Sequence, residues 1–391
     1  MSAIDFPAPI RDFIVENTSA DVVQLALQKN PFPEFSWTEI LEQISGRKKA
    51  QDKLPTWFAC EQVVYPSKIS VEQTSSESTA HYKASLISGN SLIDLTGGFG
   101  VDAYYFAQKF KQVIHCEYQP ELSEIVGYNF RQLKALNVEC LCGDGLEILQ
   151  KKNQKFDWIY LDPVRRSDRK GKVFMLEDCT PNVVALLPEY FEFSNHMLIK
   201  TAPILDIQAG LKDLQFVKNI HIVAIENEVK ELLWEIELGF KEEVSVISVN
   251  IMSKRIQEFS FKLNDEAFSR FDLPQKYLYE PNAAIMKSGG FAQIGQRYGL
   301  SKLQLNSHLY TSEKWIDFPG RCFEILQQIP YQKSEMKQYL QEKQAHVTVR
   351  NFPETVEEIR KKWKIKSGGD SYCFFTTDMN NRKIVLLCAK I

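Results

Sequence analysis

The chain has 391 residues, of which 44% are hydrophobic and 25% charged, as in ordinary globular proteins, and its length suits two or three domains. A net charge of -3 excludes a basic field over the whole protein, so a nucleic-acid partner would need a local basic patch. The eight cysteines form no CxxC pair and the six histidines show no metal-ligand spacing, so we expect neither disulfides nor a metal site.

The first part of the chain, residues 1–80, is predicted to be a helical domain. It starts without the basic flank and apolar core of a signal peptide, and no later run is long enough to span a membrane, so a cytoplasmic protein is expected. Apolar residues at helical spacing predict one helix over 12–29, which Pro31 would end. A second helix is expected over 37–48, with Ser36 as its cap.

The second part, residues 81–271, alternates short apolar strands with amphipathic helices. This order predicts a parallel sheet covered by helices on both faces. The expected strands are 92–94, 112–117, 138–142, 158–162 and 196–200, with helices at 120–136 and 181–191. After residue 219 the helices disappear, and further strands joined by short turns are expected at 220–226, 231–237 and 244–251. The sheet should therefore finish with an antiparallel pair.

The third part, residues 272–391, is predicted to be an α+β domain. Its expected helices are 283–299 and 320–328, and its expected strands are 344–350, 372–376 and 384–390.

A glycine turn follows the first strand of the second part. The strand ends on Asp94, the turn contains Gly97, Gly98 and Gly100, and a helix that includes Asp102 begins directly after it. Glycine at such a turn lets a ligand approach the backbone closely. Two cofactor classes are bound in this way, dinucleotides and S-adenosylmethionine.

Acidic residues end successive strands of the predicted sheet. Glu117 comes about 20 residues after the glycine turn, where a carboxylate accepts the ribose hydroxyls of either cofactor. Asp144, after the third strand, is placed to accept an adenine amino group, and Asp162-Pro163 ends the fourth strand, where methyltransferases face the methyl group. A dehydrogenase requires neither feature. Simpler roles stay open, because Asp94 could cap a helix, Glu117 could be a solvated strand end and Asp144 could be a turn residue.

The ordered pattern D-x-T-G-G-x-G-x-D, E, G-D, D-P resembles class I S-adenosylmethionine-dependent methyltransferases over residues 92–237. The resemblance implies a Rossmann-like sheet, mostly parallel with an antiparallel last strand, and S-adenosylmethionine as cofactor. It implies that Asp162 and Pro163 orient the acceptor amine. The cofactor-binding residues that it implies are Asp94, Thr96, Gly97, Gly98, Gly100, Asp102, Glu117, Tyr118, Asp144 and Gly145.

The acceptor is harder to derive. Enzymes that methylate an exocyclic amine often carry a second proline and an aromatic after Asp-Pro, whereas this chain has Val164 and Arg165. In this form it resembles bacterial ribosomal RNA guanine-N2 methyltransferases. Arg165 and Arg166 open a basic loop, which suits contacts with RNA phosphates or is simply a solvated loop.

The C-terminal part resembles the THUMP-like domain that lies behind such methyltransferases in bacteria. The resemblance is carried by residues 279–290, 309–312 and 319–323 and implies an RNA substrate. The basic segment 360–366, with Trp363 for stacking, is compatible with single-stranded RNA contact or is a solvated helix end. The sequence thus predicts a methyltransferase of an RNA base nitrogen. The alternatives are a methyltransferase of small molecules or proteins and a non-catalytic RNA-binding protein.

Overall fold

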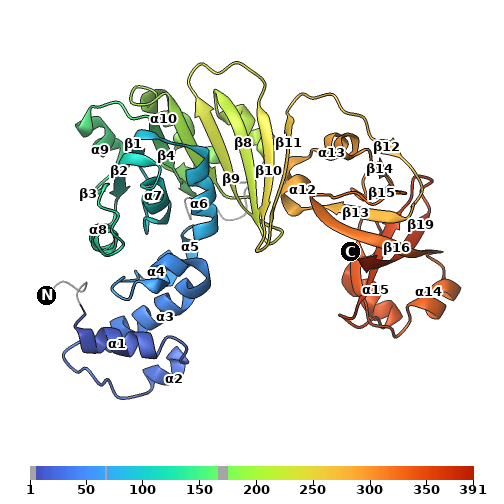
Figure 1. The fold of residues 1–391 in the computed structure, drawn as a ribbon, viewed down its shortest axis with the longest axis horizontal. Coiled ribbons are helices and arrows are strands. Elements are labelled where there is room, and N and C mark those ends of the chain that lie inside the picture. Colours follow the sequence, from blue (N-terminus) through green and yellow to red (C-terminus); the bar gives the residue numbers. More distant parts are fainter. Residues whose placement is uncertain (1–5, 67, 166–174) are drawn as a thin grey trace. The chain divides into compact units, whose positions relative to one another are not determined.

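The fold is taken from a computed structural model, which describes residues 6–66, 68–165 and 175–391 (Figure 1). The chain divides into two compact units. The first unit is Met1–Lys218 with Leu233–Lys241, and the second unit is Asn219–Leu232 with Glu242–Ile391.

Six helices open the first unit and are drawn in blue in Figure 1: α1 (Ala8–Glu16), α2 (Val22–Ala26), α3 (Trp37–Lys53), α4 (Pro55–Ala59), α5 (Lys68–Gln73) and α6 (Glu77–Leu86). The prediction of one helix over 12–29 is wrong. Asn17 bonds back to the carbonyl of Phe13 where α1 ends, and Asp21 caps α2 through the amide of Val23. Such short polar side chains compete with the helical backbone and split the predicted helix in two. Ser36 caps α3 as predicted.

A parallel sheet forms the centre of the first unit. Its strands are β1 (Gly89–Asp94), β2 (Phe110–Glu117), β3 (Val138–Cys142), β4 (Trp158–Leu161) and β7 (His196–Thr201). All four pairings in the order β7-β4-β1-β2-β3 are parallel, which confirms the prediction. The connecting helices are α7 (Val101–Phe106), α8 (Pro120–Gln132), α9 (Gly145–Lys152), α10 (Val183–Tyr190) and α11 (Ile207–Asp213). A pair of two-residue antiparallel strands, β5 (Val164–Arg165) and β6 (Cys179–Thr180), follows β4.

Four more strands extend this sheet: β8 (Val217–Ile225), β9 (Glu228–Glu237), β10 (Ser245–Ile251) and β11 (Ile256–Lys262). The complete order is β11-β10-β8-β9-β7-β4-β1-β2-β3. Glu226 and Asn227 both have positive φ, which gives the tight two-residue turn of an antiparallel hairpin between β8 and β9. The sheet is therefore mostly parallel with an antiparallel pair late in the chain, as predicted. β11, which pairs antiparallel with β10, was not predicted.

The second unit also contains an eight-stranded sheet, in the order β12-β14-β15-β13-β16-β19-β18-β17. Its strands are β12 (Arg270–Phe271), β13 (Tyr277–Pro281), β14 (Ser301–Lys302), β15 (Tyr310–Ser312), β16 (Gly320–Pro330), β17 (His346–Val349), β18 (Ser371–Thr377) and β19 (Lys383–Lys390). Its helices are α12 (Ala283–Ser288), α13 (Phe291–Tyr298), α14 (Lys333–Tyr339) and α15 (Val356–Trp363). The three predicted strands of this part are present.

Two helix predictions in this unit are wrong. The segment 320–328 belongs to β16, which pairs with β13 on one side and with β19 on the other. A register shift between Ile325 and Gln327 indicates a β-bulge, and Leu326 within it is exposed. Because the bulge adds a residue to the strand, the two-residue alternation is interrupted and the apolar residues have a three-residue spacing like that of a helix. The helix predicted over 283–299 is interrupted at Gly289, whose φ of 74° ends α12 in the left-handed region.

Among the described residues, no helix has both the length and the apolar character that a membrane-spanning segment needs.

Candidate active site

The glycine turn between β1 and α7 requires its glycines for two different reasons. Gly98 and Gly100 have φ of 53° and 79°, which glycine adopts without strain, and Gly100 caps α7. Gly97 has another reason to be glycine, since a Cβ there would overlap Nε2 of the buried His115 on β2. The turn is therefore shaped partly by packing against its own sheet and not only by ligand approach.

The backbone amides of this turn are already bonded within the protein. The amide of Thr96 donates to Oδ1 of Asp94 (3.0 Å), and that of Gly97 donates to the carbonyl of Cys116 (2.8 Å). The amide of Gly98 donates to Oε2 of Glu117 (2.9 Å), and that of Gly100 donates to the carbonyl of Gly97. Four amides that could bind an anion are thus occupied.

Asp94 and Glu117 are both buried at the ends of their strands. Burial raises the pKa of the Asp94 carboxyl well above its ordinary value, and three neighbouring carboxylates raise it further. Glu117 accepts the amide of Gly98 on one oxygen and the amide of Gln119 (2.8 Å) on the other. Each of its oxygens keeps a second lone pair for another donor.

Asp144 is exposed at the start of α9. Its Oδ1 accepts the amides of Leu146 (2.9 Å) and Glu147 (3.1 Å), so the residue is a helix cap. Gly145 follows it, and a Cβ there would overlap the carbonyl of Leu95 beside the glycine turn. The packing at Gly145 brings the end of β3 against the end of β1.

Asp162 lies at the same edge, one residue beyond β4. Its amide donates to Oγ1 of Thr96 (2.6 Å), and its carboxylate forms an ion pair with Lys200 of β7. The following Pro163 is buried. The hydroxyl of Thr96, a predicted cofactor-binding residue, is therefore in direct contact with the backbone of Asp162, a predicted catalytic residue.

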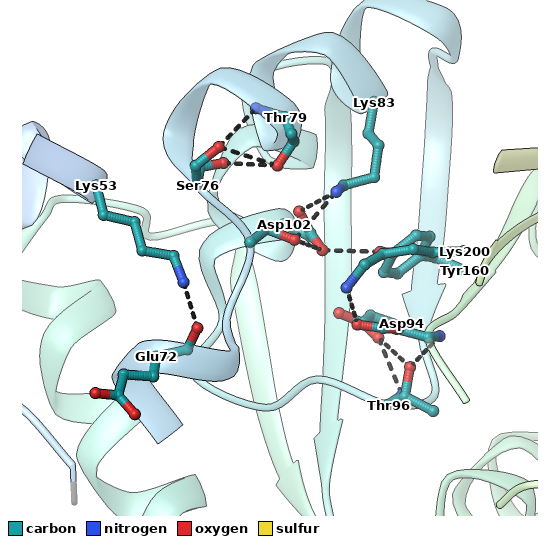
Figure 2. A network of polar contacts seen from close by, with 12 residues as sticks. Lys53, Glu72, Ser76, Thr79, Lys83, Asp94, Thr96, Asp102, Tyr160 and Lys200 are labelled. Atoms are coloured by element: carbon teal, nitrogen blue, oxygen red, sulfur yellow. Dashed lines mark hydrogen bonds and ion pairs between the residues drawn. The ribbon is translucent and has the colours of Figure 1, made fainter. Parts of the chain in front are cut away.

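Asp102, in the first turn of α7, takes part in a buried polar network (Figure 2). Its carboxylate accepts the hydroxyls of Tyr160 (2.8 Å) and Ser75 (2.9 Å) and lies 3.1 Å from Nζ of Lys83, whose side chain is fully buried. Burial alone would raise the pKa of Asp102, but the ammonium groups of Lys83 and Lys200 hold it below its ordinary value. Asp102 therefore ties helix α6 of the N-terminal region to the sheet.

A cavity of 470 Å³ opens at this edge of the sheet, a size typical of small-molecule sites. Of the predicted cofactor and catalytic residues, ten line it: Asp94, Thr96, Gly97, Gly98, Asp102, Glu117, Tyr118, Asp144, Gly145 and Asp162. Gly100 and Pro163 do not reach the cavity wall. The backbone of Arg165 forms part of β5, and Arg166 lies outside the described residues.

Residues far away in the sequence complete the cavity. Residues 73–75, at the end of α5 and in the turn that follows it, line the cavity. Thr180, the last residue of β6, and the following Pro181 line it as well. No periodicity or motif in the sequence marks these residues as part of the site. The N-terminal helices therefore contribute to the wall of the site.

The chain as a whole has a counterpart among solved structures. A crystal structure described as a "putative methyltransferase from Porphyromonas gingivalis W83" is 32% identical to this chain, with a TM-score of 0.87. The match covers 98% of this chain and 97% of that one. The chain belongs to this methyltransferase family. Two domain families match its C-terminal part, a ferredoxin-like domain over residues 277–319 and a THUMP domain-like region over residues 320–390.

Other solved structures share less with this methyltransferase. An rRNA methylase from Streptococcus thermophilus is 14% identical, with a TM-score of 0.30, and the match covers 41% of this chain and 93% of that one. SMU.1697c of Streptococcus mutans, in complex with SAH, gives the same identity and TM-score over 41% and 97% of the two chains. No curated protein matches the chain. The resemblance to class I methyltransferases with a THUMP-like domain is confirmed, whereas the ferredoxin-like domain was not foreseen.

The basic segment of the THUMP-like region does not present its aromatic residue to a ligand. Trp363 is 8% exposed and packs in the core of α15, β18 and β19. Lys362 pairs with Glu354 (3.0 Å), and Lys364 pairs with Glu342 (3.3 Å). The prediction that Trp363 stacks on single-stranded RNA is wrong, because the fold buries its ring.

Proposed function

We propose that this protein is an S-adenosylmethionine-dependent methyltransferase that transfers a methyl group to a nitrogen of an RNA base. One observation supports it above all: a cavity lined by the carboxylates at the ends of β1, β2 and β4 and just past β3, beside a glycine turn with occupied amides.

The donors at the turn do not suit a dinucleotide. A dinucleotide places its pyrophosphate against free amides of the glycine turn and the following helix. Here the amides of Thr96, Gly97 and Gly98 are bonded within the protein, and the surrounding side chains are carboxylates that repel phosphate. S-adenosylmethionine carries no phosphate, and its sulfonium and ammonium groups are positive. The residues present fit this cofactor.

The carboxylates provide one contact for each part of the cofactor. Glu117 would hold the two ribose hydroxyls with the remaining lone pairs of its two oxygens. Asp144 would accept the adenine amino group, and Asp94 would face the ammonium of the methionine end. A cation at that place favours the ionised form of Asp94, which burial otherwise disfavours.

The protein's own contribution to methyl transfer is mainly alignment. When bound, the cofactor supplies a methyl group whose bond to sulfur breaks, with the electron pair left on sulfur, as the acceptor lone pair forms the new N–C bond. Asp162 would accept a hydrogen bond from the acceptor N–H, which directs the nitrogen lone pair toward the methyl group. The proton that nitrogen loses would pass through the Asp162 carboxylate, whose side chain is 33% exposed, to water.

The RNA acceptor is supported by the THUMP-like region and by the open acceptor end of the cavity. The cavity wall beyond Asp162 is formed by Val164, which is 69% exposed. A base extruded from its stack could enter there.

The cofactor is tested by calorimetric titration of the full-length protein with S-adenosylhomocysteine and, separately, with NAD. We expect saturable binding of S-adenosylhomocysteine and none of NAD. Binding of NAD alone would refute the cofactor assignment.

The acceptor is tested by transfer of tritiated methyl groups to total RNA from a strain that lacks the gene. We expect counts in this RNA, fewer in RNA from the parent strain, and a loss of about 100-fold or more in Asp162→Ala. Glu121→Ala, an exposed carboxylate on α8 outside the cavity wall, serves as the control and should retain activity. Equal counts for Asp162→Ala would remove Asp162 from catalysis, and counts only in protein or small molecules would refute the RNA acceptor.

A further inference from the structure

We propose that Lys200 is a positioning residue for methyl transfer, which holds the Asp162 carboxylate with one oxygen toward the acceptor nitrogen. The proposal rests on the proposed function, since it concerns how Asp162 presents itself to an amine. No motif in the sequence marks Lys200, which is the last residue of the predicted strand 196–200.

The strand register places Lys200 beside Asp162. In the parallel pairing of β4 with β7, Leu161 is opposite Ile199, so Asp162, just beyond β4, comes level with Lys200, which lies within β7. In the pairing of β1 with β4, Asp94 is opposite Tyr160, so Thr96 comes level with Asp162. Thr96, Asp162 and Lys200 therefore form a row across three strands at the ligand edge of the sheet.

The contacts in this row hold Asp162 from both sides. Oγ1 of Thr96 accepts the backbone amide of Asp162 at 2.6 Å, which fixes the main chain. The ammonium of Lys200 donates to Oδ2 of Asp162, which fixes the side chain. Within the described part of the chain no donor is bonded to Oδ1. One oxygen is thus anchored, and the other is left for the acceptor N–H.

The surrounding charges explain why an anchor is needed. The carboxylates of Asp94, Asp102 and Glu117 line the same cavity as Asp162, and like charges this close repel each other. The side chain of Lys200 is 15% exposed, and its charge acts on Asp102 as well as on Asp162. Without Lys200, the Asp162 carboxylate would turn away from its acidic neighbours toward water.

Lys200 acts through Asp162 and not on the ligands. Asp162 and Tyr160 line the cavity, whereas Lys200 is absent from its wall. Figure 2 shows the lysine near Asp102 and Tyr160. Its removal should therefore change the rate of transfer much more than the binding of the cofactor.

The test compares Lys200→Met, Lys200→Arg, Asp162→Asn and the double variant Lys200→Met/Asp162→Asn in the tritium assay on RNA from the deletion strain. We expect Lys200→Met to lower kcat by about 100-fold, the loss typical of a misplaced catalytic group, while the Kd of S-adenosylhomocysteine changes less than about threefold. Lys200→Arg should recover most of the rate, since it keeps the charge. The double variant should be no slower than Asp162→Asn alone, because the lysine then has no carboxylate to place.

Lys152→Met is the matched control, since Lys152 forms a comparable ion pair with Glu139 (2.8 Å) away from the cavity. If Lys200→Met does not fold, Lys200→Gln and the double variant, which leaves no unpaired carboxylate, provide the same comparison. An unchanged kcat in Lys200→Met, additive losses in the double variant or an equal loss of cofactor affinity would overturn the proposal. If the wild type transfers no methyl to RNA, the proposed function fails and this role of Lys200 fails with it, whereas active wild type with unaffected Lys200→Met refutes only the role of Lys200.

Discussion

Replacing Lys83 by methionine tests the buried network that joins the N-terminal helices to the sheet. Lys83 is fully buried, lies 3.1 Å from Oδ1 of Asp102 and donates to Ser75 at 3.0 Å. Breaking one side of a buried ion pair typically costs about 3–5 kcal/mol, because the remaining charge stays desolvated. Asp102 keeps its hydrogen bonds from Ser75 and Tyr160 and the charge of Lys200, so we expect a loss of about 3 kcal/mol.

The assay is chemical denaturation at pH 7, followed by tryptophan fluorescence, with the slope m compared between variants. The control is Lys83→Met/Asp102→Asn, which buries no charge and should lose about 1 kcal/mol. A loss of less than about 0.5 kcal/mol in the free energy of unfolding of Lys83→Met would show that the Lys83–Asp102 pair does not stabilise the network. A double variant less stable than Lys83→Met would show the same.

The stability of Lys83→Met should also depend on pH in a defined direction. The pKa of Asp102 in the folded protein lies below its ordinary value of 3.8, because the charges of Lys83 and Lys200 outweigh the effect of burial. A carboxyl with a depressed pKa contributes stability that is present above pH 3.8 and is lost as the pH falls through the folded-state value. Removing Lys83 raises this pKa, so we expect Lys83→Met to unfold at a higher pH than the wild type during acid titration.

Three further predictions follow from the site and the second unit. Gly97→Ala should lose about 2 kcal/mol or more of stability in denaturation, because its Cβ would overlap His115. The control Gly127→Ala, whose Cβ would have its nearest neighbour at 3.7 Å, should be neutral or stabilising. Equal effects of the two variants would contradict the packing argument. Glu117→Ala should weaken S-adenosylhomocysteine binding by about 100-fold in calorimetry, the equivalent of two charge-assisted hydrogen bonds, and unchanged affinity would exclude Glu117 from the ribose site. Trp363→Ala should destabilise the second unit by about 3–5 kcal/mol, and a stable variant with weakened RNA binding would restore the stacking interpretation.

The acidic site residues were predictable because of a general property of parallel sheets. Carboxyl ends of parallel strands meet at one edge, so Asp94, Glu117 and Asp162 had to lie close together once their strands were recognised. Lys200 was not recognised as part of this site, because its place depends on the register between β4 and β7. Register is a property of two paired strands, so it cannot be read from one strand alone.

The errors have the same origin. Segment 320–328 has the apolar spacing of a helix, but its neighbours β13 and β19 supply hydrogen bonds on both sides and make it a strand with a bulge. Trp363 stands in a basic run that suits RNA contact, but the packing of α15 on β18 and β19 buries its ring.

By itself, the sequence determined the parallel sheet of the first unit, the glycine turn and the order of acids along the chain, because periodicity and turn chemistry are local. The folded structure was needed to show that the amides of the turn are already bonded, that residues 73–75 line the cavity and that Lys200 lies beside Asp162. These are contacts between segments far apart in the chain, and they exist only once the sheet has brought its strands into register.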